Sequence, residues 1–110
     1  MSMNNSAVAE MADEILFDSS TLTAGYDLVG TLQEAPVVII FDNQSTVPIG
    51  VSNNGTSIWK TFPAGEALVL DLRANHGRAE NYAFRKNMSL YLIGAAGTGN
   101  FSISYIYAGL

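Results

Sequence analysis

The chain has 110 residues, no cysteine and a formal net charge of −5; 14% of its residues are charged and 48% are hydrophobic. The missing cysteines exclude a disulfide framework and a thiolate metal site, the acidic balance argues against nucleic acid as a partner, and no apolar run approaches the roughly 20 residues of a membrane span. At this length we expect one domain with a sizeable core. Its weakly charged surface suits contact with other proteins.

Residues 1–20 differ from the rest, and we expect them to form an N-terminal acidic arm ahead of a β domain over residues 21–110. Their apolar side chains recur at spacings of three and four, which is compatible with a short amphipathic helix. Because so short a helix is marginal in isolation, an extended arm or a lead into a first strand at Ile15–Asp18 are the alternatives. The first residues lack the basic and apolar regions of a signal peptide, which indicates synthesis in the cytoplasm.

From Leu22 onward the apolar residues follow a period of two, as in β-strands. Residues 22–32 predict a weak strand with a bulge or bend at its glycines, Gly25 and Gly30. Residues 36–41 (PVVIIF) are apolar on both faces, which predicts a central strand covered on both sides.

Two turn signals, Asn53-Asn54-Gly55 and Pro63-Ala64-Gly65, divide residues 47–75. They predict three antiparallel strands in a row. In the third, Leu68, Leu70 and Leu72 alternate with Ala67, Val69 and Asp71, which predicts opposite faces.

Residues 73–87 contain four of the five basic residues and predict a long loop with one helical turn over residues 79–84. Loops of this length are commonly interaction segments. Two strands follow at 89–95 and 100–108, joined as a hairpin by Gly97-Thr98-Gly99. About seven or eight strands separated by regular turn signals indicate an all-β fold, a single antiparallel β-sandwich of jelly-roll type.

No catalytic constellation stands out in the sequence. His76 is the only histidine, and the spacing of Asp71 and Glu80 around it matches no triad or zinc motif. The glycine-rich residues 94–99 precede a strand rather than a helix, so they do not form a nucleotide-binding loop. We therefore expect no enzyme activity, no metal and no cofactor.

Charge is distributed unevenly along the chain. Seven acids and no base occur up to Asp42, whereas all bases lie between Lys60 and Lys86. This is either ordinary solvated charge or an acidic arm that docks on a basic face of a neighbouring copy or partner. Docking on a neighbouring copy predicts a homo-oligomer, a dimer or trimer. The candidate interface residues are Glu10, Asp13, Glu14, Trp59, Lys60, Arg73, Arg78, Arg85 and Lys86.

The aromatic residues of the second half have two interpretations. A platform for sugar rings would use Trp59 and the tyrosines on an exposed face, whereas aromatic residues at period two are more often core or interface. The platform would suit an adhesion module that binds host glycans.

The runs VSNNGTSIWKTFPAGEALVLDLRAN and LYLIGAAGTGNFSISYIY combine an Asn-Gly-Thr turn, a Pro-Ala-Gly turn, an alternating leucine strand and a Gly-Thr-Gly turn. In this cadence, residues 47–110 resemble the small accessory virion proteins of tailed bacteriophages, especially capsid decoration or cement proteins. The resemblance implies a β-sandwich that binds the major capsid protein on the capsid exterior, with no enzyme activity and no residue role that can be transferred. Head-fibre and tail proteins have a similar cadence, so the glycan-binding adhesion module stays the alternative.

Overall fold

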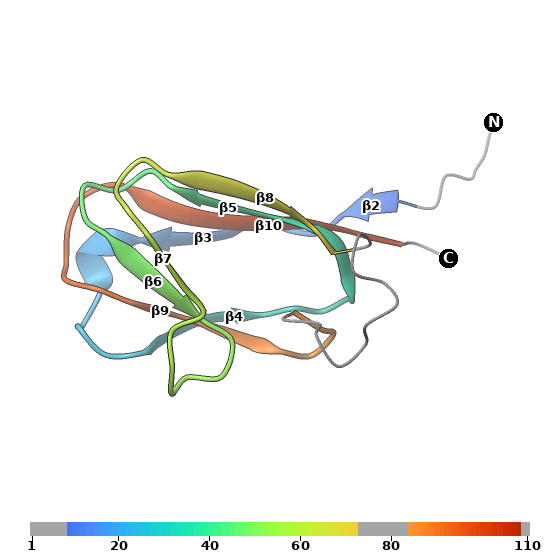
Figure 1. Cartoon of the computed structure of the whole chain (residues 1–110), viewed down its shortest axis with the longest axis horizontal. Helices are drawn as coiled ribbons and strands as arrows, with labels where there is room; N and C mark the ends of the chain where they lie inside the picture. The colour runs from blue at the N-terminus through green and yellow to red at the C-terminus, as the bar shows by residue number, and fades with distance from the viewer. Residues whose placement is uncertain (1–8, 73–83, 109–110) are drawn as a thin grey trace.

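A computed structural model describes residues 9–72 and 84–108 (Figure 1). In this part of the chain two antiparallel sheets pack face to face, with one short 3-10 segment, η1 (Ser19–Thr21). The larger sheet has the order β2-β10-β5-β8, with β3 also paired to β10, and comprises β2 (Ala9–Met11), β3 (Ile15–Asp18), β5 (Pro36–Asn43), β8 (Ala67–Asp71) and β10 (Asn100–Ala108). The smaller sheet has the order β4-β9-β6-β7 and comprises β4 (Asp27–Thr31), β6 (Ile49–Ser52), β7 (Lys60–Phe62) and β9 (Ser89–Ile93).

The strands pair in a nested order. β3 pairs with β10, β4 with β9, β5 with β8, and β6 with β7. The chain thus behaves as one long hairpin wrapped around a core, with successive pairs assigned to one sheet or the other. This connectivity is that of a jelly roll, so the predicted all-β sandwich of jelly-roll type is confirmed.

The core lies between the inner faces of the two sheets. Phe41 occupies its middle, with ring centroids 5.4 Å from both Phe62 and Phe84. The alternation predicted for the strands is confirmed: Leu68 and Leu70 of β8 pack against the core, whereas Val69 between them is 64% exposed. The fully buried aliphatic residues are Leu32, Ile39, Ile49, Val51, Leu90, Leu92 and Ile103.

Two predicted connections are wrong. β8 follows β7 in the sequence but pairs with β5 in the other sheet, so residues 47–75 do not form three neighbouring strands, although the β6–β7 hairpin is confirmed. Likewise β9 and β10 belong to different sheets and form no hairpin. The reason is that turn residues mark where the chain reverses, whereas the nested pairing decides which sheet the next strand joins.

β5 is a central strand, between β10 and β8, as predicted. Only one of its faces is covered, however: Ile39 and Phe41 are fully buried, whereas Val38 and Ile40 on the opposite face are half-buried. The expectation of cover on both sides is therefore wrong. In an antiparallel sandwich one face of each sheet meets the core and the other meets solvent or a partner.

Residues 9–18, which we expected in a separate arm, belong to the larger sheet. β2 pairs with Ile106–Ala108 and β3 with Asn100–Ile103, both along the same edge of β10. The first strand at Ile15–Asp18 is confirmed, and these residues form no amphipathic helix. Pairing along β10 gives the backbone groups that face this strand ready partners, whereas a short helix must nucleate alone. The four-residue spacing between Met11 and Ile15 arises because β2 ends at Met11 and β3 begins at Ile15.

One end of the sandwich is tied together by a buried asparagine and glycines; we call it the closed end (residues 18–22, 43–47 and 94–100). The Asn43 side chain is fully buried, and its amide donates to the carbonyls of Val47 (3.0 Å), Phe62 (2.9 Å) and Pro63 (3.2 Å). Its Oδ1 accepts from the Ser45 backbone N–H at 3.0 Å and from the Ser45 hydroxyl at 2.6 Å. Every polar atom of this buried side chain is thus satisfied.

The opposite end, which we call the open end (residues 11–14, 31–36 and 84–89), is drawn on the right in Figure 1. The Tyr105 hydroxyl accepts from the backbone N–H of Gln33 at 2.9 Å and of Glu34 at 3.3 Å, which fixes the link between β4 and β5. The link between β2 and β3 is fixed by the Ala12 N–H, which donates to the Tyr105 carbonyl at 2.9 Å. These links leave their charged side chains at the surface.

Candidate interaction surfaces

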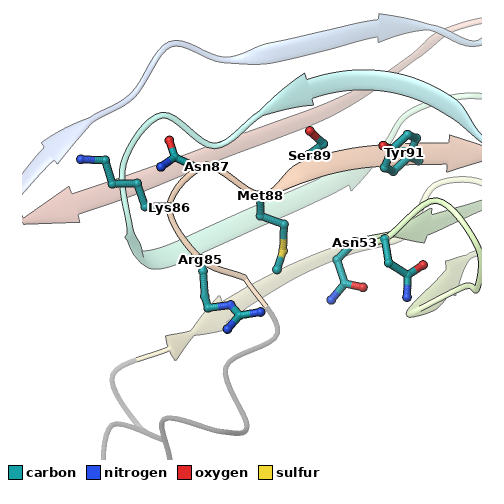
Figure 2. Close-up of a pocket in the computed structure, with 8 residues that line it drawn as sticks. Asn53, Arg85, Lys86, Asn87, Met88, Ser89 and Tyr91 are labelled. Atoms are coloured by element: carbon teal, nitrogen blue, oxygen red, sulfur yellow. The ribbon is translucent and has the colours of Figure 1, made fainter.

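A shallow pocket of about 420 Å³ extends from the open end over the outer face of β9. We call it the basic pocket; its lining includes Asn53, Arg85, Lys86, Asn87, Met88 and Tyr91. Figure 2 shows the Arg85 guanidinium and Asn53 on opposite sides of Met88, while the Lys86 ammonium points outward. The pocket thus has an apolar floor and a polar, positively charged rim.

Both walls of the basic pocket are held by local structure. On one side, Asn54 Oδ1 accepts from the N–H groups of Thr56 (2.9 Å) and Ser57 (3.0 Å), which fixes the turn after β6. Gly55 of this turn has φ 77°, and a Cβ there would lie 3.1 Å from the Tyr91 ring, so glycine permits both the backbone and the close approach. On the other side, the Met88 N–H donates to the Arg85 carbonyl at 3.2 Å and closes a turn.

A second depression, of about 370 Å³, lies where the β2–β3 link meets the β4–β5 link. We call it the acidic groove; its lining includes Met11, Asp13, Glu14, Ile15 and Glu34. Beside it the Tyr107 hydroxyl donates to Glu10 Oε1 at 3.3 Å. The Glu10 carboxylate raises the pKa of Tyr107, because it disfavours a second negative charge nearby.

The third surface is the outer face of the larger sheet. Ile40 pairs with Val69 on one side and with Ser104 on the other, so these outward side chains are neighbours. Leu16 and Val69 are 60% and 64% exposed. We call this surface the apolar face; its large side chains are Leu16, Val38, Ile40, Val69 and Ile106.

The chain was compared with family models, curated proteins and solved structures. No family model matches the sequence, and no curated protein matches it. Among solved structures, the chain is similar to a chain of the Bacillus endospore appendages, described as a novel family of disulfide-linked pili, with a TM-score of 0.51 and 14% sequence identity. The similarity covers 97% of this chain and 94% of that chain. At this identity the likeness supports a common fold alone.

The predicted interface residues separate into distinct places. Asp13 and Glu14 line the acidic groove and Glu10 lies beside it, whereas Arg85 and Lys86 line the basic pocket. Lys60 lies apart from both: its Nζ is 3.6 Å from Glu66 Oε1 and 4.9 Å from the centroid of the Phe62 ring. Arg73, Arg78 and His76 lie outside the described residues, as does most of the predicted 73–87 loop.

The Trp59 side chain is partly buried and packs against the core. Its ring lies 4.8 Å from that of Phe84, edge to face, and 5.5 Å from that of Phe41. Phe101 and Tyr105 are buried, and Tyr91 belongs to the other sheet. Trp59, Phe101 and Tyr105 are therefore core residues. They do not form a shared exposed platform.

Sequence reasoning missed the apolar face. Its signal was present in the outward positions of β5 and β8, Val38, Ile40 and Val69, but a β-branched run was interpreted as a strand covered on both sides. Among residues 9–72 and 84–108, no group of three or more acidic or histidine side chains is arranged to hold a metal ion. The same part of the chain has no helix that is long and apolar enough to span a membrane.

Proposed function

We propose that this protein is a phage virion structural protein, a capsid decoration or cement subunit that binds the outside of the assembled head through its apolar face. The observation that carries the proposal is that face itself. Val69, which is 64% exposed, pairs with half-buried Ile40, and Leu16, which is 60% exposed, lies on the same face beyond Ser102 of β10. No described element covers this sheet from outside. Exposed apolar side chains gathered on one face mark interaction sites.

The charges around the apolar face indicate the chemistry of the partner. Asp42 lies on the same face as Val38 and Ile40, and none of the described basic residues does. A partner with an apolar contact surface and basic side chains at its margin would complement it. The outer surface of major capsid protein subunits is the partner that the sequence resemblance implies.

Binding of this kind reinforces a shell by mass action. A ligand that binds the assembled state and not its separated parts shifts the equilibrium toward assembly. A flat sheet face that spans adjacent capsid subunits would act in this way, and no catalytic group would take part.

The test is binding of the purified protein to matching expanded capsids that lack it. Wild type should co-sediment with these capsids, and Val69→Lys should lose most of the binding, because it replaces the most exposed large apolar side chain of this face with a charged one. Thr61→Lys, on the exposed edge strand β7 of the other sheet, is the matched control and should bind as wild type does. Failure of wild type to bind, or equal binding by Val69→Lys, would refute the proposal.

A second candidate is a subunit of a filamentous appendage. It is favoured by the fold likeness to the Bacillus endospore appendage chain, which covers 97% of this chain. That protein forms disulfide-linked pili, whereas this sequence contains no cysteine, so its filaments would need non-covalent contacts. Electron microscopy of the concentrated protein decides: regular filaments support this candidate, and their absence together with capsid binding supports the first.

A further inference from the structure

We propose that the basic pocket of one copy binds the acidic groove of a second copy. This inference goes beyond the proposed function, because the partner is another copy of the chain. The acidic groove meets the apolar face only at its margin, where Met11 lies opposite Ile106. The inference also differs from the docking expected from sequence, since the acidic groups are held at a fixed edge of the larger sheet rather than on a separate arm.

Charge complementarity is the first observation in support. Arg85 and Lys86 are exposed on the rim of the basic pocket, and Asp13 and Glu14 are exposed on the rim of the acidic groove. Within the described part of the chain none of these four side chains forms a salt bridge. Exposed groups of opposite charge can meet across an interface, where they guide association and fix its register.

Apolar groups in both depressions are the second observation. Met88 and Tyr91 line the basic pocket, while Ile15 and Met11, which is 59% exposed, line the acidic groove. Specific interfaces combine an apolar centre with a polar rim. Methionine adapts its shape to such contacts more readily than branched side chains do. Each depression therefore combines apolar and charged side chains as one partner's side of an interface does.

The position of the two depressions determines how copies would be arranged. Thr31 lines the acidic groove and Ser89 lines the basic pocket, and these paired residues have hydroxyl oxygens 3.3 Å apart. The two surfaces are thus separate but adjacent around β4. Every copy contributes one pocket and one groove, so the contact can close reciprocally in a two-fold dimer or repeat from copy to copy.

The test uses two charge-reversed proteins. An acid variant carries Asp13→Lys and Glu14→Lys, and a base variant carries Arg85→Glu and Lys86→Glu. Each should lose self-association by about a hundredfold, because like charges then face each other. An equimolar mixture should associate again, since each reversed surface then meets its complement. Sedimentation velocity at low ionic strength measures self-association of wild type, of each variant and of the equimolar mixture. Added salt should weaken self-association of wild type.

Asp42→Lys is the control, because it reverses a charge on the apolar face and should leave self-association unchanged. Val69→Lys should likewise self-associate as wild type does while losing capsid binding, so the two proposals fail separately. Thermal unfolding of each variant checks that the fold is intact. The inference is overturned if wild type stays monomeric, if the single-surface variants associate as wild type does, or if their mixture stays monomeric.

Discussion

The closed end and the open end of this sandwich use polar residues in opposite ways. At the closed end, Asn43 is fully buried and its side chain binds three carbonyls and Ser45. At the open end, Asp13, Glu14, Arg85 and Lys86 are exposed and form no salt bridge among the described residues. The contrast separates polar groups that stabilise the fold from polar groups that are available for binding.

The closed end also contains glycines that are packed closely against backbone. Gly99 at the closed end has φ 91°, and a Cβ there would lie 2.6 Å from the Gln44 carbonyl oxygen. Its carbonyl accepts from the Ser19 N–H at 3.0 Å, so the β9–β10 connection runs between β5's loop and η1. The close backbone packing leaves no room for a side chain, which explains why this connection is rich in glycine.

Replacement of Asn43 should have the largest effect on stability. Asn43→Ala should lower the free energy of unfolding by about 3–5 kcal/mol, because the carbonyls of Val47 and Phe62 would lose a buried donor. Urea denaturation measures the change. Gln44→Ala, at an exposed neighbour, should change stability by less than about 0.5 kcal/mol. Similar losses in both variants would contradict a special role for the buried amide.

The next largest effect should come from Gly99→Ala, at about 2–4 kcal/mol, because the new Cβ would be both in the left-handed region and too close to the Gln44 carbonyl. Gly65→Ala is the matched control: its φ is 84°, but nothing lies within 4 Å of the added Cβ. It should cost only about 1 kcal/mol. Thermal unfolding compares the two variants. Equal losses of stability would show that the positive φ alone, and not the close contact with Gln44, determines the cost.

Substitutions at the open end should leave the fold almost unchanged. Lys86→Ala should alter the free energy of unfolding by less than about 0.5 kcal/mol, because the side chain is exposed and unpaired within the described residues. Urea denaturation checks this prediction. A loss of stability as large as that of Asn43→Ala would contradict the view that polar residues at the open end do not stabilise the fold.

The smallest effect concerns pH. The Asp18 carboxylate accepts from the Ser20 N–H at 2.9 Å, and this hydrogen bond lowers the pKa of Asp18 below its usual 3.8. A lowered pKa in the folded state means that the group adds stability above about pH 4, and that this increment is lost as the pH falls through the folded-state pKa. Asp18→Asn should remove this acid dependence, as measured by urea denaturation between pH 2 and pH 6. An unchanged pH profile would contradict the assignment.

Much of the fold could be predicted from the sequence. Period-two patterns located β8 and β10, and for β8 they also separated its two faces, because alternation is a local property of the chain. The bulge expected near Gly30 is confirmed by the register shift between Leu28 and Gly30. Sheet membership could not be deduced in this way, because the partners of β8 and β10 are distant in sequence.

The interaction surfaces were predicted only in part. The charged residues Asp13, Glu14, Arg85 and Lys86 could be selected from their uneven distribution. Their division into a groove and a pocket depends on how β2, β3 and β9 are arranged, which local patterns do not encode. Trp59 was an interface candidate because an exposed aromatic platform would use it, yet contact with Phe41 and Phe84 holds it against the core.

The central claim, that the apolar face contacts the capsid, is tested most directly by site-specific labelling. Because the chain has no cysteine, Val69→Cys and Thr61→Cys each introduce a single reactive thiol, on the larger and the smaller sheet respectively. The rate of maleimide labelling is compared for free and capsid-bound protein. The account predicts that binding protects Val69→Cys and leaves Thr61→Cys as reactive as in the free protein. Equal reactivity of Val69→Cys in both states would contradict it.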